Sequence, residues 1–191
     1  YTGNGSTNNI VNAGSFKPDL VWTKDRVAAN NHMLGDSVRG TNNTLFSNLT
    51  DAAYTDRGVD SFNSNGFTYS GVEAGDGNVN GNTYVAWQWQ AGQGTTSSNT
   101  NGSITSTVSV NATAGFSVVT YTGTGSNATV GHGLGVAPSF IIVKDRTQAV
   151  SWIVYQSTLG AGKFLELNTT ASVYTDTRPW NNTSPTSSVF S

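Results

Sequence analysis

The residues of this chain best suited to bind a ligand are aromatic side chains set among amides and hydroxyls. Sugar-binding faces combine aromatic platforms with amide and hydroxyl donors, in line with the general anatomy of small-molecule sites. In the C-terminal half, aromatic residues of this kind accompany many Asn and Thr side chains: they are Trp152, Tyr155, Tyr174 and Trp180. We predict that these four form an exposed carbohydrate-binding platform, with the alternative that half of them belong to the core.

Two identical charged triplets, each reading Lys-Asp-Arg, form a second candidate cluster. They are Lys24, Asp25 and Arg26, and Lys144, Asp145 and Arg146. One reading is a polar binding or catalytic cluster at the end of a strand. The other is a structural ion pair that ends the strand and satisfies backbone groups. Surface pairs of this kind are common and weak, which favours the structural role.

Catalytic residues are not predicted. Asp36, Ser37 and Arg39 lie close together, but a nucleophilic serine needs a base placed against it. The one nearby histidine, His32, corresponds at an offset of 120 residues to Trp152, which indicates a packing position. Glycan hydrolysis needs two carboxyl groups about 5–10 Å apart, and Glu73 and Glu166 are the only glutamates beside scattered aspartates.

A metal site is not predicted either. Residues 76–81 match the first half of a calcium-binding EF-hand loop, but the twelfth position is Trp87, where a bidentate Glu is required. A β-turn is therefore the expected structure, with weak Ca²⁺ binding at Asp76, Asn78 and Asn80 as the alternative. We expect no other cofactor.

Composition narrows the class of protein. Of the 191 residues, 36% are hydrophobic and 10% charged, and Gly, Asn, Ser and Thr are abundant. Such a mixture disfavours helix and suits short strands joined by turns. The chain has a net charge of −2 and no cluster of Lys and Arg side chains that could neutralise phosphates, so we do not expect it to bind nucleic acid. We expect no membrane span, because no apolar run reaches about 18 residues. The absence of cysteine excludes disulfides.

An internal repeat organises the chain. The segment 1–6 (YTGNGS) returns at 121–126 (YTGTGS), and 17–26 returns at 137–146 with Pro18 matched to Pro138. The offset is 120, and it becomes 123 near Phe67 and Phe190. We therefore predict an all-β protein of two tandem antiparallel β-sandwich modules, jelly-roll or concanavalin-like. The expected boundaries are 1–90 for the first module, 91–103 for a flexible Gly/Ser/Thr/Asn linker, and 104–191 for the second.

Each predicted module lacks one strand that the other has. Strands are expected at 19–24, 31–35, 43–49, 66–70 and 83–90, and at 104–110, 115–122, 139–144, 151–155, 162–167 and 187–190. The first module has no counterpart of 115–120, and the second none of 83–90. An incomplete sandwich exposes a strand edge that invites pairing. Either a longer polypeptide supplies the strands, or neighbouring subunits do so in a trimeric fibre or filament.

The repeat also resembles a known kind of module. The run 115–126 followed by 130–138 (VGHGLGVAP), together with 18–22, 36–40, 61–67 and 180–185, resembles a tandem module in structural proteins of tailed phages, notably marine ones. The resemblance covers nearly the whole chain. It implies a concanavalin A-like or SPRY-like sandwich on a tail fibre or another virion appendage, and it implies no catalytic residues.

These observations lead to one functional hypothesis with two alternatives. The chain is expected to be a non-enzymatic virion protein, a repeat of a tail fibre or appendage that meets host-surface glycan outside the cell. Its expected partners are further copies of itself, other virion proteins and possibly that glycan. The alternatives are a purely structural filament or decoration subunit, and a glycan depolymerase.

Overall fold

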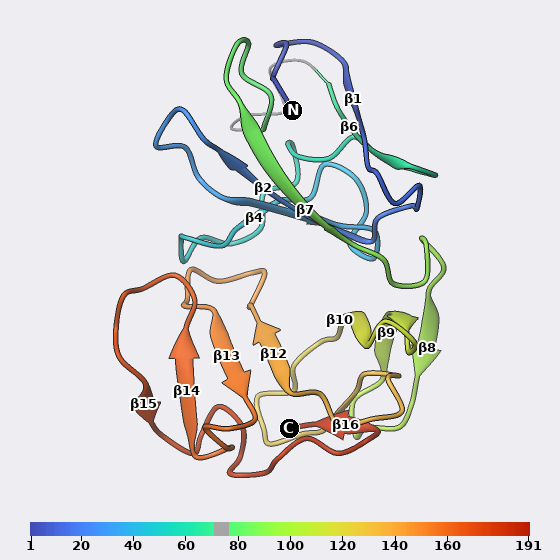
Figure 1. Cartoon of the computed structure of the whole chain (residues 1–191). Coiled ribbons are helices and arrows are strands. Elements are labelled where there is room, and N and C mark those ends of the chain that lie inside the picture. The colour runs from blue at the N-terminus through green and yellow to red at the C-terminus, as the bar shows by residue number, and fades with distance from the viewer. Residues whose placement is uncertain (71–76) are drawn as a thin grey trace.

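The computed structural model describes residues 1–70 and 77–191, and its regular structure consists of strands in antiparallel sheets (Figure 1). Seven strands belong to the first half, residues 1–90. They are β1 (Asn8–Val11), β2 (Leu20–Asp25), β3 (Met33–Asp36), β4 (Leu45–Phe46), β5 (Ser61–Asn63), β6 (Gly66–Tyr69) and β7 (Tyr84–Trp89). They form a four-stranded sheet in the order β4-β3-β2-β7 and a three-stranded sheet in the order β1-β6-β5.

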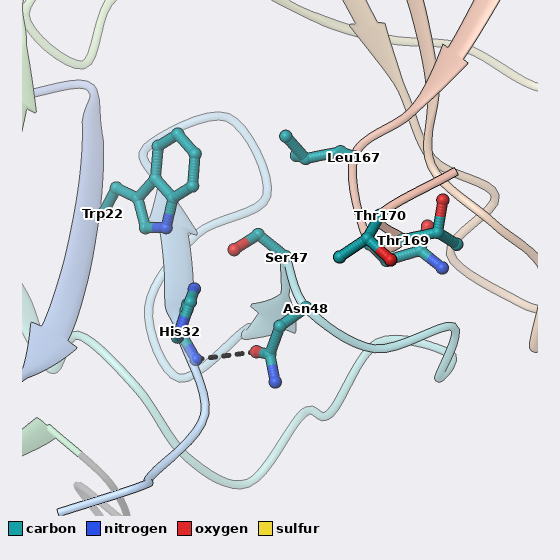
Figure 2. Close-up of a pocket in the computed structure, with 8 residues that line it drawn as sticks. Trp22, His32, Ser47, Asn48, Leu167, Thr169 and Thr170 are labelled. Atoms are coloured by element: carbon teal, nitrogen blue, oxygen red, sulfur yellow. Dashed lines mark hydrogen bonds between the residues drawn. The ribbon is translucent and has the colours of Figure 1, made fainter. Parts of the chain in front are cut away.

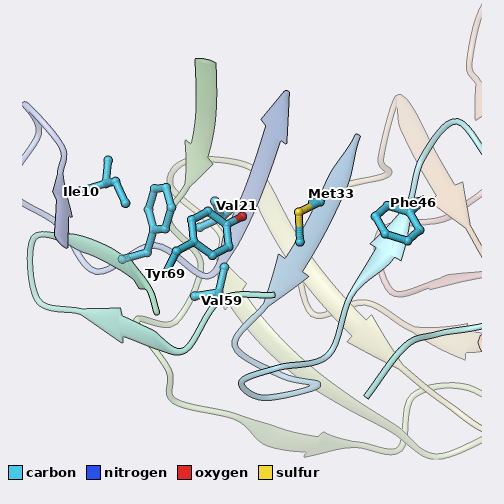
Figure 3. Packing of buried hydrophobic residues seen from close by; sticks show 7 residues of the cluster. Ile10, Val21, Met33, Phe46, Val59 and Tyr69 are labelled. Carbon is cyan, nitrogen blue, oxygen red and sulfur yellow. The ribbon is translucent and has the colours of Figure 1, made fainter. Parts of the chain in front are cut away.

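These two sheets enclose the first hydrophobic core (Figure 3). Along β2 the buried residues alternate, so that Val21 points into the core while its neighbours point outward. Val21 and Met33 come from the four-stranded sheet, whereas Ile10 and Tyr69 come from the three-stranded one. A core shared by two antiparallel layers makes the first half sandwich-like.

The second half, residues 104–191, is built from further short strands. One strand, β8 (Ser97–Asn99), precedes this half. The strands of the half itself are β9 (Ser106–Asn111), β10 (Phe116–Thr120), β11 (Val130–Gly131), β12 (Phe140–Val143), β13 (Ile153–Gln156), β14 (Lys163–Glu166), β15 (Tyr174–Thr175) and β16 (Val189–Phe190). Their sheets have the orders β12-β13-β14-β15, β11-β16 and β10-β9-β8. A second core contains Tyr155, Trp180 and Phe190.

Strand registers in the two halves correspond at fixed offsets. The pairs Val21↔Gly35, Leu34↔Leu45 and Thr44↔Tyr54 reappear 120 residues later as Ile141↔Tyr155, Val154↔Leu165 and Phe164↔Tyr174. The pair Ile10↔Phe67 reappears as Val130↔Phe190, with offsets of 120 and 123. The offsets read from the sequence are thus also the offsets of the hydrogen-bonded ladders.

Every segment predicted to be a strand contains one in the structure. Five observed strands were not predicted: β1, β5, β8, β11 and β15. Each has four residues or fewer, too short for a clear alternation. The prediction of a flexible linker at 91–103 is wrong in its central part, because β8 pairs with β9. Ala91 is also buried, since the loop that follows β7 packs on the first half.

The two halves share a third hydrophobic cluster. Leu34 and Leu45 of the first half pack there against Trp152 of the second. The indole Nε1 of Trp152 donates hydrogen bonds to the carbonyl oxygens of Phe46 (3.1 Å) and Leu49 (3.0 Å). These bonds and the shared cluster join the halves through the outer face of the β4-β3-β2-β7 sheet.

Candidate functional site

A groove lies where the two halves meet (Figure 2). Its volume is about 550 Å³ and it is open to solvent. From the first half it is lined by Trp22, His32, Ser47 and Asn48, and from the second by Leu167, Asn168, Thr169 and Thr170. An indole face combined with hydroxyl and amide groups is a lining suited to a polar ligand with an apolar side.

The groove is present because His32 occupies the position that corresponds to Trp152. Trp152 fills the contact with the turn at Phe46–Leu49 from the other side. At the same offset of 120, His32 faces residues 167–170, which correspond to 47–50. An imidazole is much smaller than an indole, so this second contact is left hollow. The exchange of an indole for an imidazole is thus the difference that leaves space here, while Asn48 and Asn168 match.

Several polar groups of the groove are fixed by the backbone. Asn48 Oδ1 accepts the backbone N–H of His32 (2.8 Å), and Asn168 Oδ1 accepts that of Trp152 (2.9 Å). Within the described residues the buried Ser47 Oγ has no hydrogen-bond partner. A buried hydroxyl without a partner is costly, so a ligand group that reaches Ser47 would remove that cost.

His32 is a neutral group at the edge of this groove. Burial, together with the positive charge of Lys24, lowers the pKa of its imidazole below the ordinary value. A neutral imidazole offers one donor and one acceptor. His32 therefore suits hydrogen bonding to hydroxyl groups better than the binding of an anion.

A row of tryptophans continues from the groove across the outer face of β2 and β7. The ring centroid of Trp22 lies 5.9 Å from that of Trp87 and 6.5 Å from that of Trp89. Trp87 is 48% exposed, although it is one of the largest apolar side chains of the chain. An exposed indole beside a polar groove is a feature that marks binding surfaces.

The predicted aromatic platform is wrong for three of its four residues. Trp152, Tyr155 and Trp180 are 4%, 3% and 2% exposed, and each belongs to a hydrophobic cluster. A sugar ring cannot stack on them in this structure. Tyr174 is 39% exposed and lies parallel to Phe164 at 4.9 Å, apart from the other three. The exposed indole of the chain, Trp87, belongs instead to the first half.

The sequence contains a signal for that row. Val85, Trp87 and Trp89 alternate with smaller or more polar residues, which predicts a strand with one large apolar face. Alternation does not say which face meets the core. Here the opposite face, with Tyr84 and Ala86, packs on the first core, so the tryptophans point outward.

Each Lys-Asp-Arg triplet has the structural role that was the second of its two interpretations, because it ends a strand and satisfies backbone groups. It does so through hydrogen bonds to the backbone and not through an ion pair. Lys24 Nζ donates to the carbonyl oxygens of Asp25 (2.5 Å) and Ala28 (3.1 Å), and Asp25 Oδ1 accepts the N–H of Val27 (2.8 Å). The second triplet repeats these bonds at the offset of 120, with Lys144, Asp145, Thr147 and Gln148. Hydrogen bonds from Thr147 lower the pKa of the Asp145 carboxyl. The two arginines contribute only backbone groups to these contacts. The N–H of Arg26 donates to Thr83 O, and the carbonyl oxygen of Arg146 accepts the N–H of Ala53.

The segment 35–40 is a structural turn. Asp36 accepts the backbone N–H groups of Val38 and Arg39 and forms a buried ion pair with the Arg39 guanidinium. Ser37 Oγ donates to Asp19 Oδ1 (2.6 Å), but this carboxylate also accepts three backbone N–H groups, so it holds the turn in place. Gln156 replaces Asp36 in the second half and accepts the equivalent N–H groups. This arrangement favours turn capping over nucleophilic catalysis.

Of the residues considered for Ca²⁺, Asn78 has another role in the structure, and Asn80 is exposed. Asp76 lies outside the described residues. Asn78 is buried, and its Oδ1 accepts the N–H of Asn4 (3.1 Å) and the Nδ2 of Asn8 (2.9 Å). Across 1–70 and 77–191, no group of three or more His, Cys, Asp or Glu side chains is placed to hold a metal ion. Asn78 therefore anchors the N-terminal segment.

Acidification is expected to destabilise the fold through its histidines. His132 is buried: its Nδ1 accepts the N–H of Leu134 (3.1 Å), and its Nε2 lies 3.2 Å from Thr186 O, which fixes the neutral ring. Burial lowers the pKa of His132, as it does for His32, although the hydrogen bond to Thr186 opposes the shift. The unfolded chain, with a histidine pKa near 6.5, therefore binds protons that the folded state does not.

Stability should accordingly be highest above about pH 6.5 and should fall as the pH is lowered toward about 5. Urea unfolding at pH 7.5, 6.5, 5.5 and 5.0 measures this slope. His132→Gln should flatten it, and His32→Gln should flatten it further. An unchanged slope in both variants would show that other groups cause it.

The fold and the site define an all-β protein of antiparallel sheets, with a polar, tryptophan-flanked groove between its halves. The whole chain, residues 1–191, matches the model of a domain of unknown function, DUF7483, and the chain belongs to that family. No curated protein and no solved structure matched it significantly. Among the described residues, no helix is long and apolar enough to cross a membrane.

Proposed function

We propose that this chain is a non-enzymatic recognition module of a tailed-phage virion, and that it binds a host-surface glycan in the groove between its halves. The observation that carries the binding role is the lining of the groove, where Trp22 faces amide and hydroxyl groups. The Trp87 ring extends the apolar surface beyond the groove. Location on an extracellular tail fibre or appendage is supported by the resemblance of the sequence motifs.

Binding is favoured over hydrolysis by the chemistry of the groove. None of the described residues that line it carries a carboxyl group. Glycoside hydrolysis in most families requires a pair of carboxyl groups on either side of the scissile bond. A depolymerase would therefore need to act elsewhere on the chain, whereas a lectin-like site needs only the aromatic and polar groups already present.

The proposal includes the two-module architecture. Ladder registers that recur at an offset of 120, and the shared capping bonds of the Lys-Asp-Arg triplets, support two copies of one sandwich in tandem. The copies would face each other through their matching outer sheet faces, where Trp22 and Ile142 both join the third cluster. The glycan groove is then a property of the pair and not of one copy.

Filling the groove should weaken glycan binding without loss of stability. His32→Trp places an indole where Trp152 stands on the opposite side, and we expect binding to weaken at least tenfold. Trp87→Ala should weaken binding while changing the stability by about 1 kcal/mol or less, because the ring is already half exposed. Binding is measured on an array of bacterial lipopolysaccharides and capsular polysaccharides, followed by titration calorimetry.

Tyr174→Ala is the matched control, because it removes an exposed aromatic ring that does not line the groove. Its affinity should equal that of the parent chain. Equal affinity of His32→Trp and the parent chain for a bound polysaccharide would refute the groove as the site. If no member of the array binds, the alternative of a purely structural filament or decoration subunit is the better account.

A further inference from the structure

We propose that the ligand of the groove is an uncharged sugar, whose ring takes the position that the Trp152 indole takes on the other side of the interface. The proposal rests on the proposed function and narrows it to one class of sugar. Two matching contacts between the halves carry it. In the Trp152 contact the indole meets the turn Phe46–Leu49, and the groove is the corresponding contact beside His32.

The turn of the Trp152 contact has a close counterpart in the second half. In the first half, Leu49 donates its N–H to Phe46 O (3.1 Å). In the second, at the offset of 120, Thr169 donates its N–H to Glu166 O (3.4 Å). The groove is therefore bordered by a turn whose other copy binds a flat ring that carries a hydrogen-bond donor.

This turn presents two backbone oxygens to the ligand. In the Trp152 contact the indole N–H donates to Phe46 O and Leu49 O. The corresponding oxygens in the turn beside the groove are those of Glu166 and Thr169. Glu166 O accepts only long hydrogen bonds from Thr169, at 3.4 Å from the N–H and 3.5 Å from the hydroxyl, so it can accept a better one. Carbonyl oxygens do not donate, so the ligand group that meets them is a donor such as a hydroxyl.

The groove is more polar than the Trp152 contact, which favours a sugar over an aromatic side chain. In the Trp152 contact, Ile142 and Leu167 of the second half pack in the shared cluster. Their counterparts at the offset of 120 are Trp22 and Ser47, and both line the groove. Figure 2 shows the Ser47 hydroxyl directed toward the side of the groove where Trp22 lies. A ring placed here meets a hydroxyl where the indole meets an apolar surface, so it should carry polar groups of its own.

A pyranose ring meets all of these groups at once. It has an apolar face that stacks on an indole, here that of Trp22, and hydroxyl groups around its edge. One hydroxyl can donate to the two carbonyl oxygens of the turn. Another can donate to Ser47 Oγ or accept from it, and Ser47 is only 2% exposed. The ligand would thus give the buried Ser47 hydroxyl a hydrogen-bond partner.

The sugar is uncharged because the groove offers no partner for a carboxylate. Among the described residues that line it, none is Lys, Arg, Asp or Glu. Lys24, whose charge lowers the pKa of His32, directs its Nζ to the carbonyl oxygens of Asp25 and Ala28. An acidic sugar would therefore lose water from its carboxylate and face carbonyl oxygens without a compensating cation. We expect the groove to exclude uronic acids.

Simple glycosides that differ in one property test the class of sugar. The full chain, labelled with ¹⁵N, is titrated at neutral pH with the methyl glycosides of glucose, galactose and mannose and with those of the corresponding uronic acids. We expect an uncharged glycoside to bind saturably and to shift the signals of the Trp22 indole and of residues 168–170. Its affinity should exceed that of the matching uronate roughly tenfold or more. Its per-O-methylated form should not bind, because it has no hydroxyl donor for the carbonyl oxygens.

Two serine substitutions separate binding from folding. Ser47→Ala removes the groove hydroxyl, so the affinity for the glycoside should fall roughly threefold or more, while the melting temperature stays the same or rises. Ser106→Ala is the matched control. Ser106 is equally buried, but its Oγ donates to Gly131 O (2.7 Å) and it does not line the groove. This control should lower the melting temperature and leave the affinity unchanged.

Equal affinities for an uncharged glycoside and its uronate would overturn the proposal, as would unchanged affinity of the per-O-methylated form or of Ser47→Ala. Failure of every uncharged glycoside to bind would also overturn it, and saturable binding of 3-methylindole instead would mean that the groove accepts an aromatic side chain. These failures are distinct from failure of the proposed function. If His32→Trp loses polysaccharide binding while both kinds of glycoside bind equally, the groove is the glycan site and only the class of sugar is wrong.

Discussion

Asp19→Ala should be the most destabilising single carboxylate substitution in the described part of the chain, at about 3 kcal/mol or more of the free energy of unfolding. The Asp19 carboxylate is fully buried and accepts the backbone N–H groups of Ala91 (2.6 Å), Gln93 (2.8 Å) and Gly94 (2.7 Å). It also accepts the hydroxyl of Ser37 (2.6 Å). Hydrogen bonds to a charged acceptor are stronger than neutral ones, and the substitution removes all of them at once.

The turn that follows β7 should loosen in the same variant. Residues 91–94 connect β7 to β8, so their release should expose this stretch to protease. Urea unfolding gives the change in stability, and limited proteolysis followed by mass spectrometry locates the cut. Ser139→Ala is the matched control: Ser139 corresponds to Asp19 at the offset of 120 but is exposed. It should change the stability by less than about 0.5 kcal/mol. Equal effects of both substitutions would contradict the anchoring role.

Trp152→Ala should destabilise the chain by about 3–5 kcal/mol and should separate the unfolding of its two halves. The indole is nearly inaccessible to solvent and joins the cluster that the halves share. Without it the halves lose their best-packed contact and two hydrogen bonds across the interface. We therefore expect one calorimetric transition in the parent chain and two in the variant.

Trp152→Phe separates packing from hydrogen bonding. The phenyl ring keeps most of the apolar contact but leaves the carbonyl oxygens of Phe46 and Leu49 without the indole donor, at an expected cost of about 1–2 kcal/mol. His32→Ala, at the corresponding position beside the groove, should cost about 1 kcal/mol or less. Equal losses for His32→Ala and Trp152→Ala would show that the two contacts are equally packed, contrary to the structure.

Much of the fold could be predicted from the sequence, because the offset of 120 appears in matched residues. Strands such as β2, β7 and β10 contain enough alternating residues to be recognised. The two-residue strands β11 and β15 could not be found in this way, because two residues show no alternation, and β11 also pairs with β16, far along the chain. The buried Asp19 also has no local signal, since its backbone N–H donors lie more than seventy residues away.

The candidate site was the harder part to predict. An aromatic residue on a strand is equally compatible with a core and with a surface, and the decision depends on what lies against each face. Trp152 is buried because the other half of the chain covers it, whereas Trp87 stays exposed because nothing in the described structure does. Sequence periodicity identifies the strand but does not identify which side is covered.

The difference between His32 and Trp152 has an evolutionary consequence. Trp152 fills the interface on one side, whereas His32 leaves it hollow on the other, so we expect a tryptophan at position 32 to fill the groove while every strand keeps its partners. We expect such a substitution to change the shape of the groove at little cost to folding. Comparison of the residue at position 32 across relatives would separate lineages that keep a pocket from those that have closed it.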